Sequence, residues 1–537
     1  MYARFNTGLQ GWLPLAQMLL VLGVAGILLH VARVYWRLGH VPGPFWARLT
    51  NIQRIVWVKS GIAHEKHQEV HDRYGDIVRF GPNMISLGDP DWIPLGNFYR
   101  TLMPYTRKGG ALPAVFNTRD ETLHRQIKTP IAPLFSMSNT LPLESFVDRT
   151  IKVMTDQLDE RFIDSQATFD LADWLQYFAF DVMGTLTFSK RYGFLEQGRD
   201  VGQMLSTIWD YMKTAAPLTI DSFNHQMTQI PWFDEIWYKN SFTALFRKTT
   251  GFSILSIVGK CIAERKEAQK SGKGAEHGRG DRDMLSQFFE IAANNPSLPQ
   301  WCVFSPLKLY PSHRNHCLPI TRIRCRCVTA WTFSNVIAGS DSTAVVMKTI
   351  WYNLLAHPKT MQSLLEELRQ ADAKRPMAKP YPAWRDVCDL PYLDACIQEG
   401  VRMHPPFCLP LERVVPAGFL PEATVVGMSP YVVNRHKPTF GQDAEDWNPD
   451  RWMVPKELRQ KREAAIMTFG AGRRVCLGRH IAMLELKKIV PALLLRYELL
   501  DPKRYRLENS WFFRQWGIDV KVKKRVSDQE SSSDRAP

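Results

Sequence analysis

Cysteine is scarce in this chain, and no internal repeat is present. Nine cysteines are scattered over 537 residues, which argues against the disulfide framework of a small secreted domain and favours a reducing compartment. Acidic residues are outnumbered, 53 Asp+Glu against 68 Lys+Arg, which gives a formal net charge of +15. That excess suits an acidic partner surface or an anionic lipid as well as a nucleic acid, so charge alone selects no partner. A hydrophobic share of 45% with 23% charged residues argues against a disordered, collagen-like or coiled-coil protein.

Residues 12–32 form an apolar run without a formal charge. As a helix, this run is long enough to cross the roughly 30 Å hydrocarbon core of a bilayer. Arg33 and Arg37 follow it, and this basic bias predicts a lumenal segment 1–11 and a cytosolic bulk of the chain. A cleaved signal peptide is the less favoured alternative, because no convincing small-residue cleavage site follows. We predict a retained single-pass anchor, followed by a proline hinge at residues 41–44.

The rest of the chain predicts one large domain at 45–526, mainly helical with a small sheet fraction, hence mainly α within the α+β class. Helical spacing dominates from about residue 140 to 375, where 328–356 is apolar enough for a long buried helix. Further predicted elements are helices at 63–74, 143–162, 391–403 and 477–497, a β-hairpin within 76–89, a turn-rich stretch at 405–469 and a strand near 518–522. The polar tail 527–537 is expected to be disordered.

One cysteine lies in a sequence context that suits metal ligation. In the run Phe469-Gly-Ala-Gly472-Arg-Arg474-Val-Cys476-Leu-Gly478, the thiol sits in a glycine-rich loop directly before an apolar helix. Glycines permit tight turns and the close approach of a flat ligand, while the neighbouring arginines and the helix N-terminus favour the thiolate. A thiolate held in this way is a good axial ligand for haem iron. An inert buried cysteine is the alternative, and core packing is expected for Cys261, Cys388, Cys396 and Cys408.

This run resembles the haem-binding signature of the cytochrome P450 family, Phe-x-x-Gly-x-Arg-x-Cys-x-Gly. All five fixed positions match, at Phe469, Gly472, Arg474, Cys476 and Gly478. The resemblance extends from the proline hinge to the C-terminal strand. It implies a single cytochrome P450-like domain with a long central helix and small β-sheets, and a haem b whose iron is axially ligated by Cys476.

The segment Ala338-Gly339-Ser340-Asp341-Ser342-Thr343 interrupts the long apolar helix with an acid and three hydroxyls. Burying these groups without partners would cost several kcal/mol, so a wet, functional groove is predicted rather than a polar stripe facing solvent. The Ser342 hydroxyl can reach the carbonyl of Ala338, four residues back, and loosen the helix there. The segment is similar to the family's oxygen-activation motif, where the residue after the acid is usually Thr. The resemblance implies proton delivery through Asp341 and Ser342, a role that Thr343 shares.

Glu399 and Arg402 are spaced i,i+3 on a predicted helix, which alone would indicate a surface ion pair worth a few tenths of a kcal/mol. Downstream, Trp447-Asn448-Pro449-Asp450-Arg451-Trp452 resembles the family's aromatic-x-Pro-acid-Arg-aromatic segment. The resemblance implies a buried network of Glu399, Arg402 and Arg451 that acts as structural scaffolding for the loop under the haem.

Haem carries two propionates, which need cationic partners. The resemblance assigns them Arg474, Arg413 and the basic end of the family's Trp-x-x-x-Arg helix. That last motif reads His124-x-x-x-Lys128 here, and both residues depart from the pattern. Lysine is a point charge rather than a planar fork, so the alternative for these two positions is solvated surface residues.

Residues 302–326 do not fit the rest of the chain. They contain five basic residues and no acid, and they directly precede the long apolar helix. The pair Cys-Val occurs at 302–303 and again at 327–328, so that joining Trp301 to Cys327 would give a smooth helix entry. We hypothesise a retained in-frame intron, which transcript sequencing across the junction tests: a complete lack of messages without these codons would refute it. If translated, the segment is expected to be a disordered excursion.

A zinc site is the alternative interpretation of this segment, built from His313, His316, Cys317, Cys325 and Cys327. It is disfavoured because their spacing fits no closed pattern of four ligands.

Together these motifs resemble a membrane-anchored haem-thiolate monooxygenase of the endoplasmic reticulum that uses O2 to oxidise a small apolar organic substrate. No Gly-x-Gly-x-x-Gly motif or flavin-binding region is recognised, which implies electrons from a separate NADPH-cytochrome P450 reductase. Arg473, Arg479, Lys487 and Lys488 are expected to dock this acidic flavoprotein.

The motifs are similar to those of fungal members that tailor secondary metabolites, and no nucleic-acid partner is expected. Two alternatives stay open at this point: an isomerase or dehydratase of the same family without net oxygenation, and a non-catalytic haem-binding protein or sensor.

Overall fold

The computed structural model describes residues 3–525, with long gaps at 221–251, 271–281 and 299–319 and shorter gaps between 93 and 119, at 219, at 296–297, between 416 and 423, and at 504. In this part the chain is mainly helical with small sheets, as predicted. Its longer helices are α1 (Ala3–Arg37), α2 (Ile52–Lys59), α3 (Ala63–Tyr74), α4 (Glu121–Lys128), α6 (Glu144–Leu158), α7 (Leu171–Phe188), α9 (Met204–Leu218), α13 (Phe252–Lys270), α14 (Met284–Asn294), α15 (Ile320–Ala356), α16 (Pro358–Lys374), α18 (Pro391–Met403), α21 (Lys456–Ala465) and α22 (Arg479–Arg496). The helices predicted at 63–74, 143–162, 391–403 and 477–497 correspond to α3, α6, α18 and α22.

Four small sheets accompany these helices in the described residues. The largest has the strand order β1-β2-β8-β7-β3, and the others are β6-β12-β9, β10-β11 and β4-β5. The strands are β1 (Ile77–Gly81), β2 (Met84–Leu87), β3 (Asn97–Phe98), β4 (Tyr105–Thr106), β5 (Gly110–Ala111), β6 (Phe169–Asp170), β7 (Leu411–Val414), β8 (Val425–Met428), β9 (Tyr497–Lys503), β10 (Arg506–Ser510), β11 (Phe512–Trp516) and β12 (Asp519–Lys524). The predicted hairpin is the antiparallel pair β1 and β2, and the predicted C-terminal strand is β12. The sequence interpretation missed β7 and β8, which lie in the stretch expected to consist of turns.

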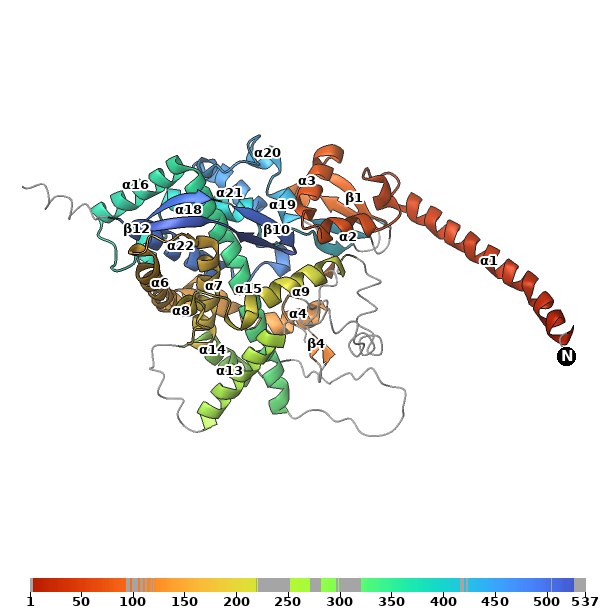
Figure 1. The fold of residues 1–537 in the computed structure, drawn as a ribbon, viewed down its shortest axis with the longest axis horizontal. Helices are drawn as coiled ribbons and strands as arrows, with labels where there is room; N and C mark the ends of the chain where they lie inside the picture. Colours follow the sequence, from red (N-terminus) through yellow and green to blue (C-terminus); the bar gives the residue numbers. More distant parts are fainter. Residues whose placement is uncertain are drawn as a thin grey trace, which may run out of the picture.

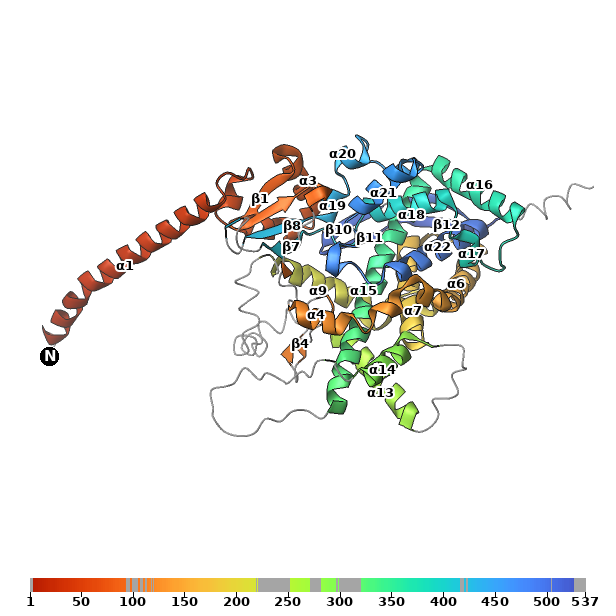
Figure 2. The same cartoon turned by 180° about the vertical axis from the view of Figure 1, so that it is seen from behind.

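Helix α15 runs through the centre of the molecule, with α7, α14, α18 and α22 packed against it (Figures 1 and 2). Most of its apolar residues from Cys327 to Leu355 are buried, and Trp331 and Trp351 are almost completely enclosed. The helix starts at Ile320, earlier than predicted. Residues 320–326, which were expected to belong to a disordered excursion, are therefore helical. The zinc candidates His313, His316 and Cys317 and the tail 527–537 lie outside the described residues.

Helix α1 extends away from the rest of the molecule (Figure 1). Within the described residues, it contains the one helix segment long and apolar enough to cross a membrane, Gln17–Arg37, with a mean hydropathy of 2.0 and no buried part. This segment ends later than the predicted span 12–32. The chain then turns at Leu38 and Val41, which are buried in an apolar cluster with residues of β2 and β8. The residues around the predicted hinge are thus packed against the largest sheet.

Helix α3 turns three histidines toward the interior. His64, His67 and His71 are all buried, with the His67 ring against those of Trp57 and Phe80. Burial lowers the pKa of His64 from 6.5 to about 3 and the pKa of His71 to about 4, and it holds the pKa of His67 well below its ordinary value. All three rings are therefore neutral in the folded protein at neutral pH.

These histidines predict acid lability of the folded protein. Their folded pKa values lie below the unfolded value of 6.5, so the unfolded chain binds more protons as the pH falls below 6.5. The contribution of these neutral rings to the free energy of unfolding is fully present above that pH and is lost as the pH falls toward 3 to 4. Between about pH 7 and pH 5 the loss is roughly 2 kcal/mol per histidine. Urea unfolding in detergent micelles at the two pH values measures this loss. His67→Phe should reduce it, whereas His357→Phe, at an exposed histidine, should not; equal losses in all three proteins would contradict the explanation.

Candidate functional site

The loop between α21 and α22 presents Cys476. A hydrogen bond from the Cys476 N–H to the Phe469 carbonyl, 2.8 Å long, closes this loop. Gly470 and Gly472 adopt φ values of +66° and +63°, a conformation that side chains disfavour. A β-carbon on Gly472 would meet no atom within 4 Å. Crowding therefore does not require a glycine at this position; the positive φ angle of the backbone does. The role of Gly470 was missed in the sequence.

Cys476 is the one exposed cysteine among the six that the structure describes. Cys327, Cys396 and Cys408 are buried and Cys261 and Cys388 half-buried, in agreement with core packing. Although the Cys476 side chain is exposed, the protein around it displaces much of the water near the sulfur, and this desolvation raises the pKa of its thiol. Hydrogen bonds from the backbone of Gly478 and Arg479 and the charges of Lys128 and Arg479 act in the opposite direction. The expected net preference for the thiolate is thus wrong for the protein alone; a bound metal would deprotonate the thiol.

Helix α4 brings His124 and Lys128 to the cysteine loop. Asp120 caps its N-terminus by accepting hydrogen bonds from the Thr122 and Leu123 N–H groups. His124 and Lys128 are four residues apart and therefore lie on one face of the helix. Lys128 Nζ donates to the Arg473 carbonyl at 2.7 Å, which ties this face to the loop of Cys476.

Arg474 and Arg413 complete a basic cluster with these two residues. Arg474 donates to Glu121 at 2.6 Å and to the Val115 carbonyl at 3.3 Å. Burial and the charge of Arg474 lower the pKa values of Arg413 and Lys128, and they lower that of His124 to about 4. Glu121 lies among these cations, and hydrogen bonding to Arg474 lowers its pKa against the effect of burial.

This basic cluster fits a dianionic ligand. Neighbouring cations that are partly buried repel one another, and a bound anion with more than one acceptor stabilises them. In the described part of the chain, His124 Nε2 is moreover buried without a hydrogen-bond partner. A haem with two propionates requires an accessible sulfur ligand, a loop that lets the flat ring approach and cations for the two carboxylates. The residues present provide all three and therefore fit a haem.

The polar segment of α15 has the backbone contacts that its spacing predicts. Ser342 Oγ donates to the Ala338 carbonyl at 2.6 Å, and Thr343 Oγ1 donates to that of Gly339 at 2.9 Å. Asp341 and Ser342 are half-buried and Ala338 is exposed, so this part of α15 is more accessible than the buried stretches on either side. A β-carbon on Gly339 would lie 2.6 Å from the Met183 sulfur, which shows how closely α7 approaches the segment.

Asp341 belongs to a polar chain inside the protein that the sequence did not reveal. Gln176 Nε2 donates to Asp341 Oδ1 at 2.7 Å, and Lys348 Nζ donates to Gln176 Oε1 at 2.5 Å. Burial raises the pKa of Asp341 and lowers that of Lys348, while the charge of each acts against the shift of the other. In the sequence, this chain could have been recognised only from Lys348, a charged residue seven positions after Asp341 on an otherwise apolar helix. Gln176 on α7 has no pattern that indicates its role.

Glu399, Arg402 and Arg451 form a buried network. Glu399 accepts two hydrogen bonds of 2.8 Å from Arg402, and both side chains are completely buried. Arg451 Nε lies 3.5 Å from Glu399 Oε1, and Trp452 Nε1 donates to Glu399 Oε2 at 2.9 Å. The hydrogen bonds from Arg402 and the charges of Arg402 and Arg451 lower the pKa of Glu399 despite its burial. The predicted three-residue geometry is therefore present.

Asn434 connects this network to the cysteine loop. Arg402 Nη1 donates to the Asn434 carbonyl at 2.9 Å, and Asn434 Nδ2 donates to the Arg402 carbonyl at 3.0 Å and to Thr468 Oγ1 at 2.9 Å. The Met467 N–H donates to Asn434 Oδ1 at 2.9 Å. Since Thr468 precedes Phe469 directly, the start of the loop is bonded to α18 through one amide side chain.

Two residues expected to dock a reductase are placed differently. Lys487 is buried and pairs with Asp394 at 2.8 Å, and Lys488 is completely buried between Glu144 and Asp148. Both side chains lie on the buried side of α22, so the prediction that they dock a reductase is wrong. Arg473 and Arg479 are exposed beside Cys476.

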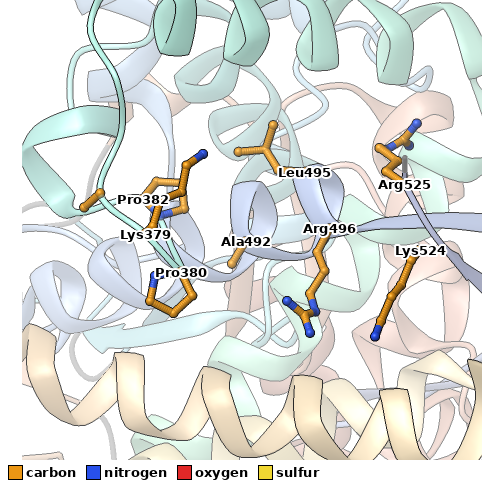
Figure 3. A pocket seen from close by; sticks show the side chains of 9 residues that line it. Lys379, Pro380, Pro382, Ala492, Leu495, Arg496, Lys524 and Arg525 are labelled. Atoms are coloured by element: carbon orange, nitrogen blue, oxygen red, sulfur yellow. The ribbon is translucent and has the colours of Figure 1, made fainter. Parts of the chain in front are cut away.

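A separate pocket lies at the far end of α22 (Figure 3). Its lining combines basic and apolar side chains and includes Ala492, Leu495 and Arg496 of α22 with Lys524 and Arg525. The 18 residues of α22 correspond to about 27 Å along the helix, and Cys476 precedes the opposite end. None of the predicted site residues lines this pocket.

Comparison with known proteins agrees with the geometry. The chain matches the family model described as Cytochrome P450 over residues 42–300 and 320–512. It is 59% identical to the cytochrome P450 monooxygenase asR2 of Sarocladium schorii, over 96% of this chain and 97% of that protein. It is 58% identical to the cytochrome P450 monooxygenase pkfB of Emericella nidulans over the same shares of the two chains. Among solved structures it is similar to the heme domain of cytochrome P450DA, with a TM-score of 0.62 and 15% identity over 90% of this chain and 98% of that one.

The family match is interrupted between residues 300 and 320. The unmatched residues are Trp301 and the first part of the suspected insert 302–326. The match resumes at residue 320, where α15 begins.

Proposed function

Because the chain belongs to the cytochrome P450 family and is a monooxygenase with a haem held by a cysteine thiolate, we propose that Cys476 is the residue that ligates the iron. The observation that carries this assignment is the exposed Cys476 in a loop closed on Phe469, next to the basic cluster. When bound, the haem supplies the activation of O2 for insertion of one oxygen atom into an organic substrate.

The basic cluster would hold the two propionates of the haem. Arg413, Arg474 and Lys128 supply positive charge, and Arg474 has the planar fork that binds a carboxylate through two parallel hydrogen bonds. His124, with a pKa of about 4, is neutral at neutral pH and would act as a hydrogen-bond donor. Phe469, Gly472 and Gly478 shape the loop so that the flat ring can approach the backbone.

Asp341, Ser342 and Thr343 would deliver protons for the activation of O2 beside this part of α15. Asp341 is held by Gln176, which leaves its second carboxylate oxygen to exchange protons. The Ser342 hydroxyl, bonded to the Ala338 carbonyl, supplies the donor that the family usually takes from Thr, without the methyl group. The buried charge of Lys348 favours the ionised form of Asp341 against desolvation.

An aromatic cluster favours an apolar substrate. Phe116, half-exposed, stacks on Phe407 with ring centroids 5.6 Å apart, and Phe407 contacts Phe512 at 4.3 Å. Phe116 follows Val115, whose carbonyl accepts a hydrogen bond from Arg474, so the cluster begins beside the proposed propionate site. Apolar walls with a few polar groups are typical of small-molecule sites.

We further infer the cellular setting of the reaction. The exposed Arg473 and Arg479 beside Cys476 suit an acidic NADPH-cytochrome P450 reductase, and the apolar part of α1 suits an anchor in the endoplasmic reticulum membrane. Relatives named monooxygenases in fungi support oxidative tailoring of a fungal secondary metabolite. They favour this role over an isomerase, a dehydratase or a non-catalytic haem protein.

The interrupted family match supports an inserted segment before α15. We propose that residues 302–326 derive from a retained intron, and that the protein without them joins Trp301 to Cys327 at the entry of the central helix.

Replacement of Cys476 tests the proposed haem site. Cys476→Ala should abolish the thiolate-type Soret band of the reduced protein with CO, because no other described cysteine is exposed. Cys388→Ala, at a half-buried cysteine, should leave the band unchanged. Absorbance difference spectra of both variants make the comparison, and a normal band in Cys476→Ala would refute the assignment.

Replacement of Asp341 tests proton delivery. With a ligand identified by its spectral shift and with added reductase, Asp341→Asn should lower product formation by about 100-fold, because general acid catalysis contributes 10² or more. NADPH use should fall less, so that more electrons end in peroxide. The control Asp156→Asn removes an exposed carboxylate of α6 that pairs with Lys152, outside the polar chain of Asp341. Equal product yields per NADPH in the native protein and in Asp341→Asn would contradict the role.

A further inference from the structure

The pocket at the far end of α22 lies where three segments that are remote in the sequence meet. It is lined by Ala378, Lys379, Pro380 and Pro382 from the loop after α16, by Ala492, Leu495 and Arg496 from the end of α22, and by Lys524 and Arg525 from the end of β12 and the residue after it. Its volume is about 320 Å³, at the lower end of the range of roughly 300–1,000 Å³ for small-molecule sites. Among the described residues, no acidic side chain lines it.

The basic side chains of the pocket are only partly neutralised. Arg496 Nη2 and Lys524 Nζ lie 2.5 Å and 3.1 Å from the same oxygen, Asp159 Oδ2. Two cations therefore share one carboxylate, which leaves one positive charge in excess. Figure 3 shows these two side chains next to each other, with their tips turned in the same direction. Lys379, in contrast, has a carboxylate of its own, that of Asp372 at 3.5 Å.

Arg496 and Lys524 keep hydrogen-bond donors for a ligand. Arg496 donates to Asp159 through Nη2 and to the Tyr497 hydroxyl through Nε, and no described residue accepts a hydrogen bond from its Nη1. The ammonium of Lys524 has three donors, of which Asp159 takes one. The two side chains are 34% and 55% exposed, so an incoming anion can reach them. A carboxylate suits these donors, because charge-assisted hydrogen bonds to it are strong, and one excess charge matches a monoanion.

Arg525 adds a further positive charge to the pocket. Its Nε donates to the Leu494 carbonyl at 2.9 Å, and no described carboxylate forms an ion pair with it. Burial lowers the pKa of its guanidinium, while the charges of Glu498 and Arg369 act against each other. An anion in the pocket would reduce this cost of burying a cation.

The remaining walls of the pocket are apolar. Pro380, Pro382, Ala492 and Leu495 present side chains without hydrogen-bonding groups, so they suit a hydrocarbon body rather than a hydrated inorganic ion. Figures 1 and 2 show α16 and β12 at the end of the molecule opposite to α1. The pocket is therefore remote from the apolar helix, and its ligand would arrive from water rather than from a bilayer.

We propose that this pocket is a second ligand site, separate from the reaction site, for a small organic acid. The acid places its carboxylate against Arg496 and Lys524 and its apolar body against Pro380 and Ala492. It joins the end of α22 to the loop after α16 and to β12. Since these segments meet only in the folded chain, the ligand binds the folded state and raises the free energy of unfolding.

Photolabelling locates the site. The full-length protein in phosphatidylcholine nanodiscs is illuminated with a benzoate that carries a diazirine, and mass spectrometry identifies the labelled peptides. The expected result is adducts on residues 378–382, 492–496 and 524–525. Excess benzoate should displace this label. Benzamide, its neutral counterpart, and inorganic phosphate, which has no apolar body, should displace it much less.

A variant of one cation tests the recognition of the carboxylate. Lys524→Met leaves the pair of Arg496 and Asp159 in place and should weaken benzoate binding, measured by isothermal titration calorimetry, by about tenfold, because one charge-assisted hydrogen bond is lost. Benzoate should also raise the urea midpoint of the native protein more than that of Lys524→Met. Lys521→Met, at an exposed lysine of the same strand outside the pocket, is the matched control and should behave as the native protein. Far-UV circular dichroism shows that each variant is folded.

Four results would overturn the proposal. A lack of adducts on the three peptides would refute the site itself. Displacement of the label by benzamide as effectively as by benzoate would show that the cations do not select the ligand. Equal displacement by phosphate would show that the apolar walls do not contribute. Equal benzoate affinity of the native protein and of folded Lys524→Met would refute the proposed position of the carboxylate.

Discussion

The buried carboxylate of Glu399 is the interaction on which the site depends. Two arginines, one indole N–H and the Asn448 backbone converge on its two oxygens. A carboxylate buried without these donors would be strongly destabilising, so the elements that carry them are held together. Through Arg402 and Asn434 the same network reaches Met467 and Thr468. The loop that presents Cys476 thus begins at a point that a buried ion pair fixes, on residues far from it in the sequence.

The charges around the loop are arranged for a ligand rather than for the protein alone. Burial and the charge of Arg474 lower the pKa values of His124, Lys128 and Arg413, and burial raises that of the Cys476 thiol. Each of these shifts makes the protein without a ligand less favourable. A planar group with a central cation and two carboxylates would reverse all of them, which is a physical reason for this fold to bind haem tightly.

Local patterns in the sequence predicted local features well. The five fixed positions around Cys476, the four-residue spacing of Ser342 and Ala338, and the limits of α3 and α18 all depend on neighbours along the chain. Contacts between segments that are distant in the sequence could not be predicted as well. Gln176 and Asn434 have no recognisable pattern, because their roles arise only when helices from different parts of the chain meet. Lys487 and Lys488 were taken as surface charges because a basic pair in a helix does not show which carboxylates, here Asp394 and Glu144, pack against it. The packing of Leu38 and Val41 against β2 and β8 was not predicted, because these strands are remote in sequence.

The contact between Gly339 and Met183 determines how closely α7 and α15 can approach each other. Since the thioether occupies the position that a side chain of α15 would otherwise take, the packing at this point depends on a slender, polarizable chain with several rotatable bonds. Such a chain can fill small irregularities between the two helices by changing its rotamer, while the helix backbones keep their separation. A glycine on one helix and a methionine on the other thus combine a close approach with a contact that tolerates small changes in its neighbours.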